Sequence, residues 1–524
     1  MGEGLRAVSL LKKTAKTVER AAKLGKIARA ARAASSASDA ESRHKARRAL
    51  AALLADARGV PMKVGQVLAS GEAEDPFREL VTGVEPMDLE TSRRVLEAEW
   101  GRSVDEVLQN LEPAVVAASL GQAHPATLQS GERVAIKVQY PGITDAVAAE
   151  LRLVGLIPGV GPVKKWGFEI DAYRRVLHDN MVRELDYRVE AKQQTCFARD
   201  SAVAGVVVPK VFPELSTRAV LVQSWEEGVP FPSVLSWSRA ERLHIGRILL
   251  ELLFRSVFVA GLVHGDPHVG NYRFRGGSHP QVILYDYGCV VHVPEAARLA
   301  LLKLILWQRE GGQLDPLEAF AAMGFDSKKL EPISDALPEL AEALFLPFLS
   351  DAAFKSEDWR LGTRIERVLG ELRWWFRSAG PPELFLLMRA FHGLFLYLEK
   401  LGIALPWWPL VKRSVPKELL DRARAFEPPH LPRVRVRPSR ARAKLLRVEI
   451  HSETAAHEEP TTLAMPAREA LELREVIPDD VQRRIEASGT DLSALQARVR
   501  QTELAPQLLF HHHSGGKHYR VWLE

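Results

Sequence analysis

The sequence is poor in cysteine and has no long apolar run. Its two cysteines, Cys196 and Cys289, lie far apart and form no CxxC pair. A disulfide framework is therefore not expected, and we predict a cytoplasmic protein. The best candidate for a membrane span, Leu384 to Leu398, is interrupted by Arg389 and His392, so it predicts a buried helix instead. No signal peptide is apparent.

A strong charge of either sign is also missing. The formal net charge is only +5 over 524 residues. This suits anionic partners such as nucleotides or acidic lipids, and it does not single out nucleic acid, which we do not expect as a partner. Hydrophobic residues make up 46% and charged residues 26% of the chain, as in ordinary globular proteins. A chain of this length predicts two to four domains.

The most informative stretch runs from Val263 to Asn271 and reads VHGDPHVGN. Asp266 precedes Asn271 by five positions, and Asp286 follows in the sequence YDYG. Phosphoryl transfer from a nucleotide needs such a set: one Asp orients the attacking hydroxyl, while an Asn and a second Asp hold the metal ions that bridge the phosphates. A predicted hairpin between the two motifs, with strands at 272–274 and 281–285, would bring Asn271 and Asp286 to one end.

Two readings based on transition metals remain open at this stage. His264 and His268 flank Asp266, and such a set suits zinc, but that reading leaves the downstream Asp286 without a role. Three consecutive histidines, 511–513, also invite a metal interpretation. Neighbouring residues on a strand point to opposite faces, so only His511 and His513 would converge.

A lysine on a strand is predicted upstream of the catalytic stretch. Residues 133–139 alternate as a strand and contain the sequence VAIK, which ends at Lys137. Two further strands, 112–118 and 123–128, flank a turn of small residues. Kinases use such a hairpin to cover the nucleotide phosphates and such a lysine to hold them. The turn is rich in alanine where a protein kinase has glycines.

A kinase also needs a helix glutamate to pair with the strand lysine. The segment Glu184–Ala191 is predicted to lie on one helix, and Glu184 and Glu190 are the candidates. Asp186 and Glu190 are one turn apart on such a helix.

The other segments give the domain organisation. Residues 1–50 hold thirteen lysines and arginines against four acids and predict a basic amphipathic helix, which suits an anionic membrane surface. Residues 206–211 and 218–224 predict two strands, 225–228 predict a hinge, and 240–260 predict a long core helix. We expect these divisions: a basic extension (1–50), a second helical extension (51–111), an N-lobe (112–228), a helical C-lobe (229–415), a Pro/Arg-rich linker (416–444) and a small αβ domain (445–524).

Taken together, these motifs resemble the UbiB/AarF/ADCK family of atypical kinases. The resemblance covers roughly residues 55–410. It rests on KVGQ at 63–66, AASLGQ at 117–122, VAIK ending at Lys137, ELD at 184–186 and HGDPHVGN with DYG. The fold class it implies is α+β: a bilobal protein-kinase-like fold with an N-terminal helical extension and a small C-terminal αβ domain.

The resemblance also implies residue roles. Lys137 would contact the phosphates of ATP or ADP and pair with Glu190, and Asp266 would be the catalytic Asp. Asn271 and Asp286 would hold Mg²⁺. The remaining nucleotide-site candidates are Lys63 and Gln66, facing Glu184 and Asp186, and the alanine-rich loop with Ala117, Ala118, Ser119, Gly121 and Gln122.

The function implied is that of an ATP-binding, Mg²⁺-dependent kinase or ATPase, with a possible role in isoprenoid lipid or quinone metabolism and a lipid or quinone-precursor substrate at a membrane. One alternative is a small-molecule phosphotransferase of the aminoglycoside or choline kinase type, whose loop is also HGDxxxxN. The other is a non-catalytic, nucleotide-gated scaffold.

Overall fold

The computed structural model describes residues 86–118, 120–145, 147, 168–370, 372–431, 442–452, 461–514 and 516–524. The predicted basic helix, Lys63, Gln66 and Ser119 lie outside these residues. The chain divides into two compact units. The first contains the described residues up to Pro294, with Asp351–Asp358 and Pro382–Leu419, and the second contains Glu295–Ser350, Trp359–Pro381 and Leu420–Glu524. The fold is α+β and protein-kinase-like, as predicted.

An antiparallel sheet forms the N-lobe of the first unit, with strand order β1-β3-β4-β6 and β2 paired to β3. Its strands are β1 (Leu108–Leu111), β2 (Val116–Ala117), β3 (Gly121–Leu128), β4 (Arg133–Gln139) and β6 (Val220–Ser224). Alternation along β4 decides what each face carries. Val134, Ile136 and Val138 are buried in one core with α4 (Leu89–Trp100) and α5 (Val104–Val107). Lys137 therefore points to the opposite face.

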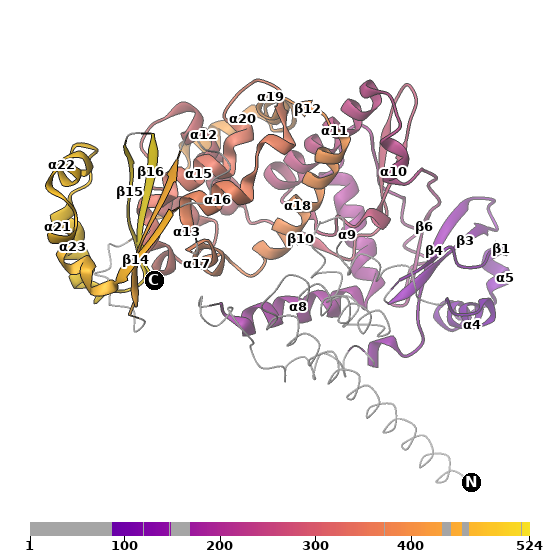
Figure 1. The fold of residues 1–524 in the computed structure, drawn as a ribbon. Coiled ribbons are helices and arrows are strands. Elements are labelled where there is room, and N and C mark those ends of the chain that lie inside the picture. The colour runs from indigo at the N-terminus through magenta and orange to yellow at the C-terminus, as the bar shows by residue number, and fades with distance from the viewer. Residues whose placement is uncertain are drawn as a thin grey trace, which may run out of the picture. The chain divides into compact units, whose positions relative to one another are not determined.

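Helix α9 (Tyr187–Asp200) covers that opposite face, where Tyr187 and Ala191 pack against Leu221 of β6. Figure 1 shows the strands β3, β4 and β6 of this sheet, with α4 beside them. The predicted single helix over Glu184–Ala191 is wrong. Helix α8 (Ile170–Glu184) ends first, and α9 begins after Leu185 and Asp186. Asp186 has extended backbone angles, and its carboxylate accepts a hydrogen bond from the Arg188 backbone N–H. An N-cap of this kind starts a new helix.

Both ends of α9 are tied to other parts of the unit. The Tyr187 backbone N–H donates to the Arg218 carbonyl, 3.0 Å away, just before β6. At the other end Ser201 Oγ donates to the Leu262 carbonyl, and Arg255 Nε donates to the Asp200 carbonyl.

The C-lobe part of the first unit is mainly helical. Its described elements are β5 (Val206–Val207), α10 (Phe231–Val234), α11 (Arg239–Phe254), the π-helix η2 (Arg255–Ala260), β7 (Leu262–His264), η3 (Val269–Asn271), β8 (Tyr272–Arg275), β9 (Gln281–Leu284), β10 (Val290–His292), β11 (Phe354–Lys355), η6 (Ser356–Asp358), α18 (Leu384–Leu401), β12 (Ala404–Leu405) and α19 (Trp407–Ser414). The predicted 272–274 and 281–285 hairpin is confirmed as β8 and β9, and β5 adds to β9 in parallel.

Three predicted elements differ in detail. The 240–260 helix changes from α to π hydrogen bonding at Arg255 and ends at Gly261, whose φ of 67° is left-handed. The strand predicted over 112–118 shrinks to β2, because the Ala118 N–H turns back to the Gly121 carbonyl, 2.8 Å away. The strand predicted from 206 to 211 is only β5, since the chain leaves the sheet after Val207.

The second unit combines a helical part with a four-stranded sheet. Its helices are α12 (Glu295–Glu310), α13 (Pro316–Ala322), α14 (Ser327–Leu330), η4 (Glu331–Ala336), α15 (Leu337–Phe345), η5 (Leu346–Phe348), α16 (Leu361–Leu369), α17 (Leu372–Ala379), η7 (Ala467–Glu472), α21 (Leu473–Val476), α22 (Asp479–Ala487) and α23 (Leu492–Gln501). Helix α20 (Lys417–Ala425) crosses the boundary between the units. The sheet order is β14-β13-β16-β15, all antiparallel, with β13 at Leu445–Ser452, β14 at Thr461–Pro466, β15 at Gln507–Ser514 and β16 at Lys517–Leu523.

The two faces of this sheet are covered by different elements. Val521 and Leu523 share a core with Ile485, Leu495 and Val499 of the helices after β14. On β16, Arg520 alternates with these residues and is fully buried. Its guanidinium donates to the carbonyls of Glu366 and Leu369 at the end of α16 and pairs with Glu449 at 3.1 Å. Arg520 thereby gives a donor to the Leu369 carbonyl at the end of the helix and a second donor to the Glu366 carbonyl, which also accepts the Gly370 N–H.

Histidines line the same sheet. His511 Nδ1 lies 3.1 Å from His518 Nε2, and the His513 and His518 rings stack with centroids 4.3 Å apart. Burial, together with the neighbouring arginines and histidines, lowers the pKa of His511 to about 3 and that of His518 to about 4. The His511 and His518 rings are therefore held neutral. Among the described residues no cluster of His, Cys, Asp and Glu is arranged to hold a metal ion.

We expect the C-terminal sheet to lose about 3 kcal/mol of stability as the pH falls from 7 to 4. The unfolded chain takes up protons on these histidines below about pH 6.5, whereas the folded chain resists protonation until about pH 4, so acid favours unfolding. Hydrogen exchange of peptides over β15 and β16, corrected for intrinsic rates, measures the effect. His518→Gln should flatten the pH dependence. The control His430→Gln, at a side chain that is 85% exposed, should leave it unchanged.

No helix in the described parts of the chain has the length and hydrophobicity to cross a membrane. The apolar segment at Leu384 is α18, which carries Arg389 and His392 within it.

Candidate active site

Three charged side chains meet where β4, α9 and the segment after β9 come together. Lys137 Nζ lies 2.9 Å from both carboxylate oxygens of Glu190 and 2.9 Å from Asp286 Oδ2. It also lies 5.0 Å from the centroid of the Tyr187 ring. The exposed fractions are 22% for Lys137, 2% for Glu190 and 35% for Asp286. The cluster is therefore open to solvent on the Asp286 side.

Burial and charge act in opposite directions within this cluster. Burial by itself lowers the pKa of Lys137, but the carboxylates of Asp286 and Glu190 raise it well above its ordinary value. Burial and the charge of Asp286 together raise the pKa of Glu190 to about 7, although Lys137 lowers it. The lysine is thus a fixed positive charge, whereas two carboxylates compete for it.

The loop before β8 holds the other predicted side chains close to Asp286. The Tyr285 backbone N–H donates to the Asn271 carbonyl at 3.1 Å, which closes the β8–β9 hairpin as predicted. Asn271 Nδ2 donates to the Asp266 carbonyl at 3.3 Å. The structure therefore links Asp266, Asn271 and Asp286 through one hairpin.

His264 fixes the backbone of the second motif. Its Nε2 donates to the Asp286 carbonyl, and its ring packs edge-on against Tyr287 and Tyr272. Burial lowers the pKa of His264, so a neutral imidazole occupies this site. His268 Nδ1 accepts the Gly270 N–H at 3.0 Å. Both histidines thus have roles in the loop, and the zinc reading based on them has no support here.

Arg389 is a site residue that the sequence reasoning missed. Its Nη2 lies 2.6 Å from Asp266 Oδ1, and the two side chains are only 15% and 10% exposed. The sequence showed Arg389 only as a charge inside the apolar segment 384–398, where it was used as an argument against a membrane span.

Glu184 lies next to the cluster, in which Lys137 pairs with the other candidate, Glu190. A Cβ added to Gly288 would be 3.2 Å from Asp286 Oδ1 and 3.4 Å from Glu184 Cγ. Glu184, on the last residue of α8, thus borders the second motif from a different helix than Glu190. Asp186 faces away, with its carboxylate bound to Arg188 at 2.6 Å.

The alanine-rich turn packs closely on the strand that carries Lys137. Ala117 pairs with Gln122, and Gly121 pairs with Gln139 of β4. A Cβ added to Gly121 would lie 2.3 Å from the Val138 carbonyl oxygen and 2.9 Å from the Tyr187 hydroxyl. Glycine is therefore required at this position. The turn itself is closed by the hydrogen bond from the Ala118 N–H to the Gly121 carbonyl.

We expect Gly121→Ala to destabilise the chain by about 2 kcal/mol or more, because the new methyl group must displace backbone atoms of β4. Chemical denaturation followed by circular dichroism measures the change. Val116→Ala in the same turn is the control, since Val116 is 53% exposed and its truncation should cost within about 0.5 kcal/mol. Equal stability of the two variants would contradict the close packing of Gly121.

Gln122 requires a correction. Its side chain, predicted to contact the nucleotide, is 1% exposed and bridges the start of α4 instead. Gln122 Oε1 accepts the Met87 N–H at 2.7 Å, and its Nε2 donates to the Met87 carbonyl and Ser92 Oγ. The reason is strand alternation: Gln122 faces the α4 core, on the side of the sheet away from Lys137.

Asn271 and Asp286 have the donor chemistry for Mg²⁺, which prefers oxygen ligands. Such ions are usually held by one or two protein groups together with phosphate oxygens from the nucleotide. The residues present therefore fit the predicted ion.

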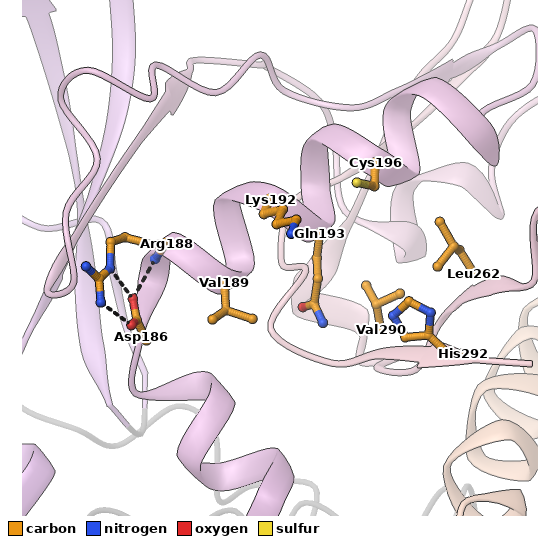
Figure 2. A pocket seen from close by; sticks show the side chains of 9 residues that line it. All are labelled: Asp186, Arg188, Val189, Lys192, Gln193, Cys196, Leu262, Val290 and His292. Carbon is orange, nitrogen blue, oxygen red and sulfur yellow. Dashed lines mark hydrogen bonds and ion pairs between the residues drawn. The ribbon is translucent and has the colours of Figure 1, made fainter.

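A separate cavity of about 530 Å³ lies against α9 on the face away from Glu190. Figure 2 shows its lining, with Asp186 and Arg188 at one end and Cys196, Leu262 and His292 at the other. Among the predicted site residues, Asp186 alone contributes to this lining.

Comparisons with known proteins agree with this geometry. The family model described as an ABC1 atypical kinase-like domain matches residues 79–311. The zebrafish (Danio rerio) atypical kinase COQ8B, mitochondrial, is 27% identical over 361 residues, which cover 66% of this chain and 57% of the relative. The Saccharomyces cerevisiae atypical kinase COQ8, mitochondrial, is 25% identical over 364 residues, covering 66% of this chain and 71% of the relative.

A solved structure of the Mycobacterium tuberculosis protein Rv3197 with erythromycin is 26% identical, covers 72% of this chain and 97% of its own, and has a TM-score of 0.49. The chain spans about half the length of the first curated relatives it matches, at 57% and 48%.

The matched region contains the strand lysine, the helix glutamate and both acidic motifs in the order predicted from the sequence. The comparisons therefore support the predicted resemblance to the UbiB/AarF/ADCK family of atypical kinases, and residues 79–311 are the part that matches the ABC1 atypical kinase-like domain.

Proposed function

We propose that this chain is an ATP-binding, Mg²⁺-dependent kinase or ATPase. The observation that supports this most strongly is the position of Lys137, which lies 2.9 Å from both the α9 glutamate and Asp286. A strand lysine held between a helix acid and a metal-binding acid is the arrangement that phosphoryl transfer requires. A loop lysine in solvent would have neither partner.

Each residue has a defined role in this proposal. Lys137 contacts the nucleotide phosphates and keeps its bond to Glu190, while the phosphates take the place of Asp286 beside it. Asp266 orients the attacking hydroxyl or water. Asn271 and Asp286 would hold Mg²⁺, which supplies positive charge to the phosphate oxygens. Ala117, Ala118, Ser119 and Gly121 would form the turn that covers the phosphates.

The remaining parts of the proposal concern regions and partners outside the described site. Lys63 and Gln66 would fold over the nucleotide and face Glu184 and Asp186. The basic segment 1–50 would lie on an anionic membrane surface, and the acceptor would be an isoprenoid lipid or quinone precursor. The relatives named above are mitochondrial atypical kinases; for this chain we propose a cytoplasmic protein that lies peripherally on a membrane. The chain would be divided into a basic extension (1–50), a second helical extension (51–111), an N-lobe (112–228), a helical C-lobe (229–415), a linker (416–444) and a small αβ domain (445–524).

The experiment is nucleotide binding and hydrolysis by the purified full chain. We expect ATP to bind by calorimetry only with Mg²⁺ present, and phosphate release to stop in excess chelator. Adding vesicles that contain anionic phospholipid should increase phosphate release, whereas neutral vesicles should not. A full chain that binds no ATP with or without Mg²⁺ would overturn the proposal. A screen of lipid, quinone-precursor and amino-alcohol acceptors then separates this function from the aminoglycoside or choline kinase type.

A further inference from the structure

One face of α18 lies directly on the catalytic loop. Arg389, Gly393 and Tyr397 are spaced by four residues, so they share a face of this helix. Arg389 pairs with Asp266, and the Tyr397 hydroxyl donates to the Pro267 carbonyl at 3.4 Å. A Cβ added to Gly393 would lie 2.2 Å from Pro267 Cβ. The helix therefore approaches the loop as closely as backbone allows.

The aromatic end of this face fixes the helix in place. The Tyr397 ring lies 4.5 Å from that of Phe231 and 5.2 Å from that of Tyr272, the first residue of β8. Arg389 thus projects from a helix whose position is set by the same hairpin that carries Asn271. The contact with Asp266 is between two buried side chains and not between two surface side chains.

A buried arginine in an apolar helix needs a reason. Removing a guanidinium from water is costly unless an opposite charge and good geometry compensate for it. Asp266 compensates for Arg389 at 2.6 Å, with both side chains at least 85% buried. Asp266 would also face the anionic phosphates in the proposed reaction, where an unpaired carboxylate repels the nucleotide.

We propose that Arg389 is a positioning residue of the catalytic centre, acting through Asp266. It holds one carboxylate oxygen of Asp266 in a fixed direction and offsets its negative charge beside the phosphates. This inference rests on the proposed function, because it assigns Arg389 to the same site.

The test is a double-mutant cycle in ATP hydrolysis by the full chain. Misplacing a reacting group by about 1 Å can cost about a hundredfold in rate, so Arg389→Gln should lower kcat by roughly 30- to 100-fold. The KM for ATP should rise by at most about threefold, because Arg389 acts on the nucleotide only indirectly, through the charge of Asp266. Asp266→Asn should lower kcat at least as much. The double variant should be no slower than Asp266→Asn alone, because Arg389 has then nothing to position.

Matched variants keep the cycle interpretable. Arg247→Gln removes a half-exposed helix arginine that pairs with Glu251, 3.2 Å away, and should leave kcat unchanged. Arg389→Lys keeps the charge without the planar fork and should lower kcat about fivefold. If Arg389→Gln does not fold, the lysine variant carries the test on its own. Calorimetric binding of ATP with Mg²⁺ confirms that each variant is folded.

The outcomes separate the two claims. An active parent chain whose Arg389→Gln and Arg389→Lys variants keep the parent kcat overturns this inference and leaves the proposed function intact. A double variant that is slower than Asp266→Asn by the full Arg389→Gln factor shows that Arg389 acts independently, which also overturns it. A parent chain that binds no ATP removes the proposed function and this inference with it.

Discussion

An Asp286→Asn variant is expected to lose about a thousandfold in ATP hydrolysis while melting at or above the temperature of the parent chain. Asp286 is the proposed Mg²⁺ ligand that also lies 2.9 Å from Lys137. Removing a ligand charge removes several kcal/mol of the stabilisation that a metal ion gives to the transferring phosphate. The assay is phosphate release at saturating Mg²⁺ and ATP.

The unchanged stability has a separate reason. Lys137 keeps Glu190 as a buried partner at 2.9 Å, and Asp286 is one of the charges that raise the pKa of Glu190. An amide at 286 removes this repulsion between carboxylates, so the folded state should not suffer. The matched control is Asp358→Asn, an exposed acid in η6 of the same unit, which should change neither quantity. Loss of hydrolysis together with a large drop in melting temperature would point to misfolding instead.

A Lys137→Met variant is expected to lose roughly 100- to 1000-fold in hydrolysis, as when one charged donor is removed from a transition state. Unlike the Asp286 variant, it should also be less stable by about 3 kcal/mol, because the buried carboxylate of Glu190 would lose its cation while Asp286 remains close by. Lowering the pH towards 6 should restore part of that stability, because burial raises the pKa of Glu190 to about 7 even beside Lys137, and without the lowering effect of Lys137 the carboxylate takes up a proton more readily.

Urea unfolding at pH 6 and pH 8 measures this second effect. Lys192→Met is the control, because Lys192 follows Glu190 by two residues on α9 and its side chain is exposed. It should leave hydrolysis and stability within about 0.5 kcal/mol of the parent chain. A Lys137→Met variant that is as stable as the parent at pH 8 would show that the two carboxylates do not depend on this lysine.

The strand alternation and the spacing of the two acidic motifs were enough to predict how Lys137, Asn271 and Asp286 come together. Period-two burial along β4 fixes the face of the lysine, and a short hairpin leaves few positions for the second motif. The break between α8 and α9 was not predictable in this way. Leu185 continues the helical pattern, and the capping role of Asp186 appears only once its backbone is extended.

Contacts far apart in the sequence account for the other differences. Gln122 belongs to the alanine-rich loop that was predicted to cover the phosphates. Only the position of α4 against the sheet shows that the Gln122 amide binds Met87 and Ser92 instead. Arg389 lies more than a hundred residues after Asp266, and no local pattern connects them. A single sequence shows where a charge interrupts an apolar helix, but not which distant charge compensates for it.

The fastening of α9 at both ends limits how this site can be controlled. Its first residue is held by the N-lobe through the Arg218 carbonyl, and its last turn is held by the C-lobe through Ser201 and Arg255. Because both ends of α9 are held by these hydrogen bonds, Glu190 can move away from Lys137 only if the hydrogen bonds at one end break. We therefore do not expect on–off control by withdrawal of Glu190 from Lys137, and we expect regulation to act on nucleotide access to the site instead.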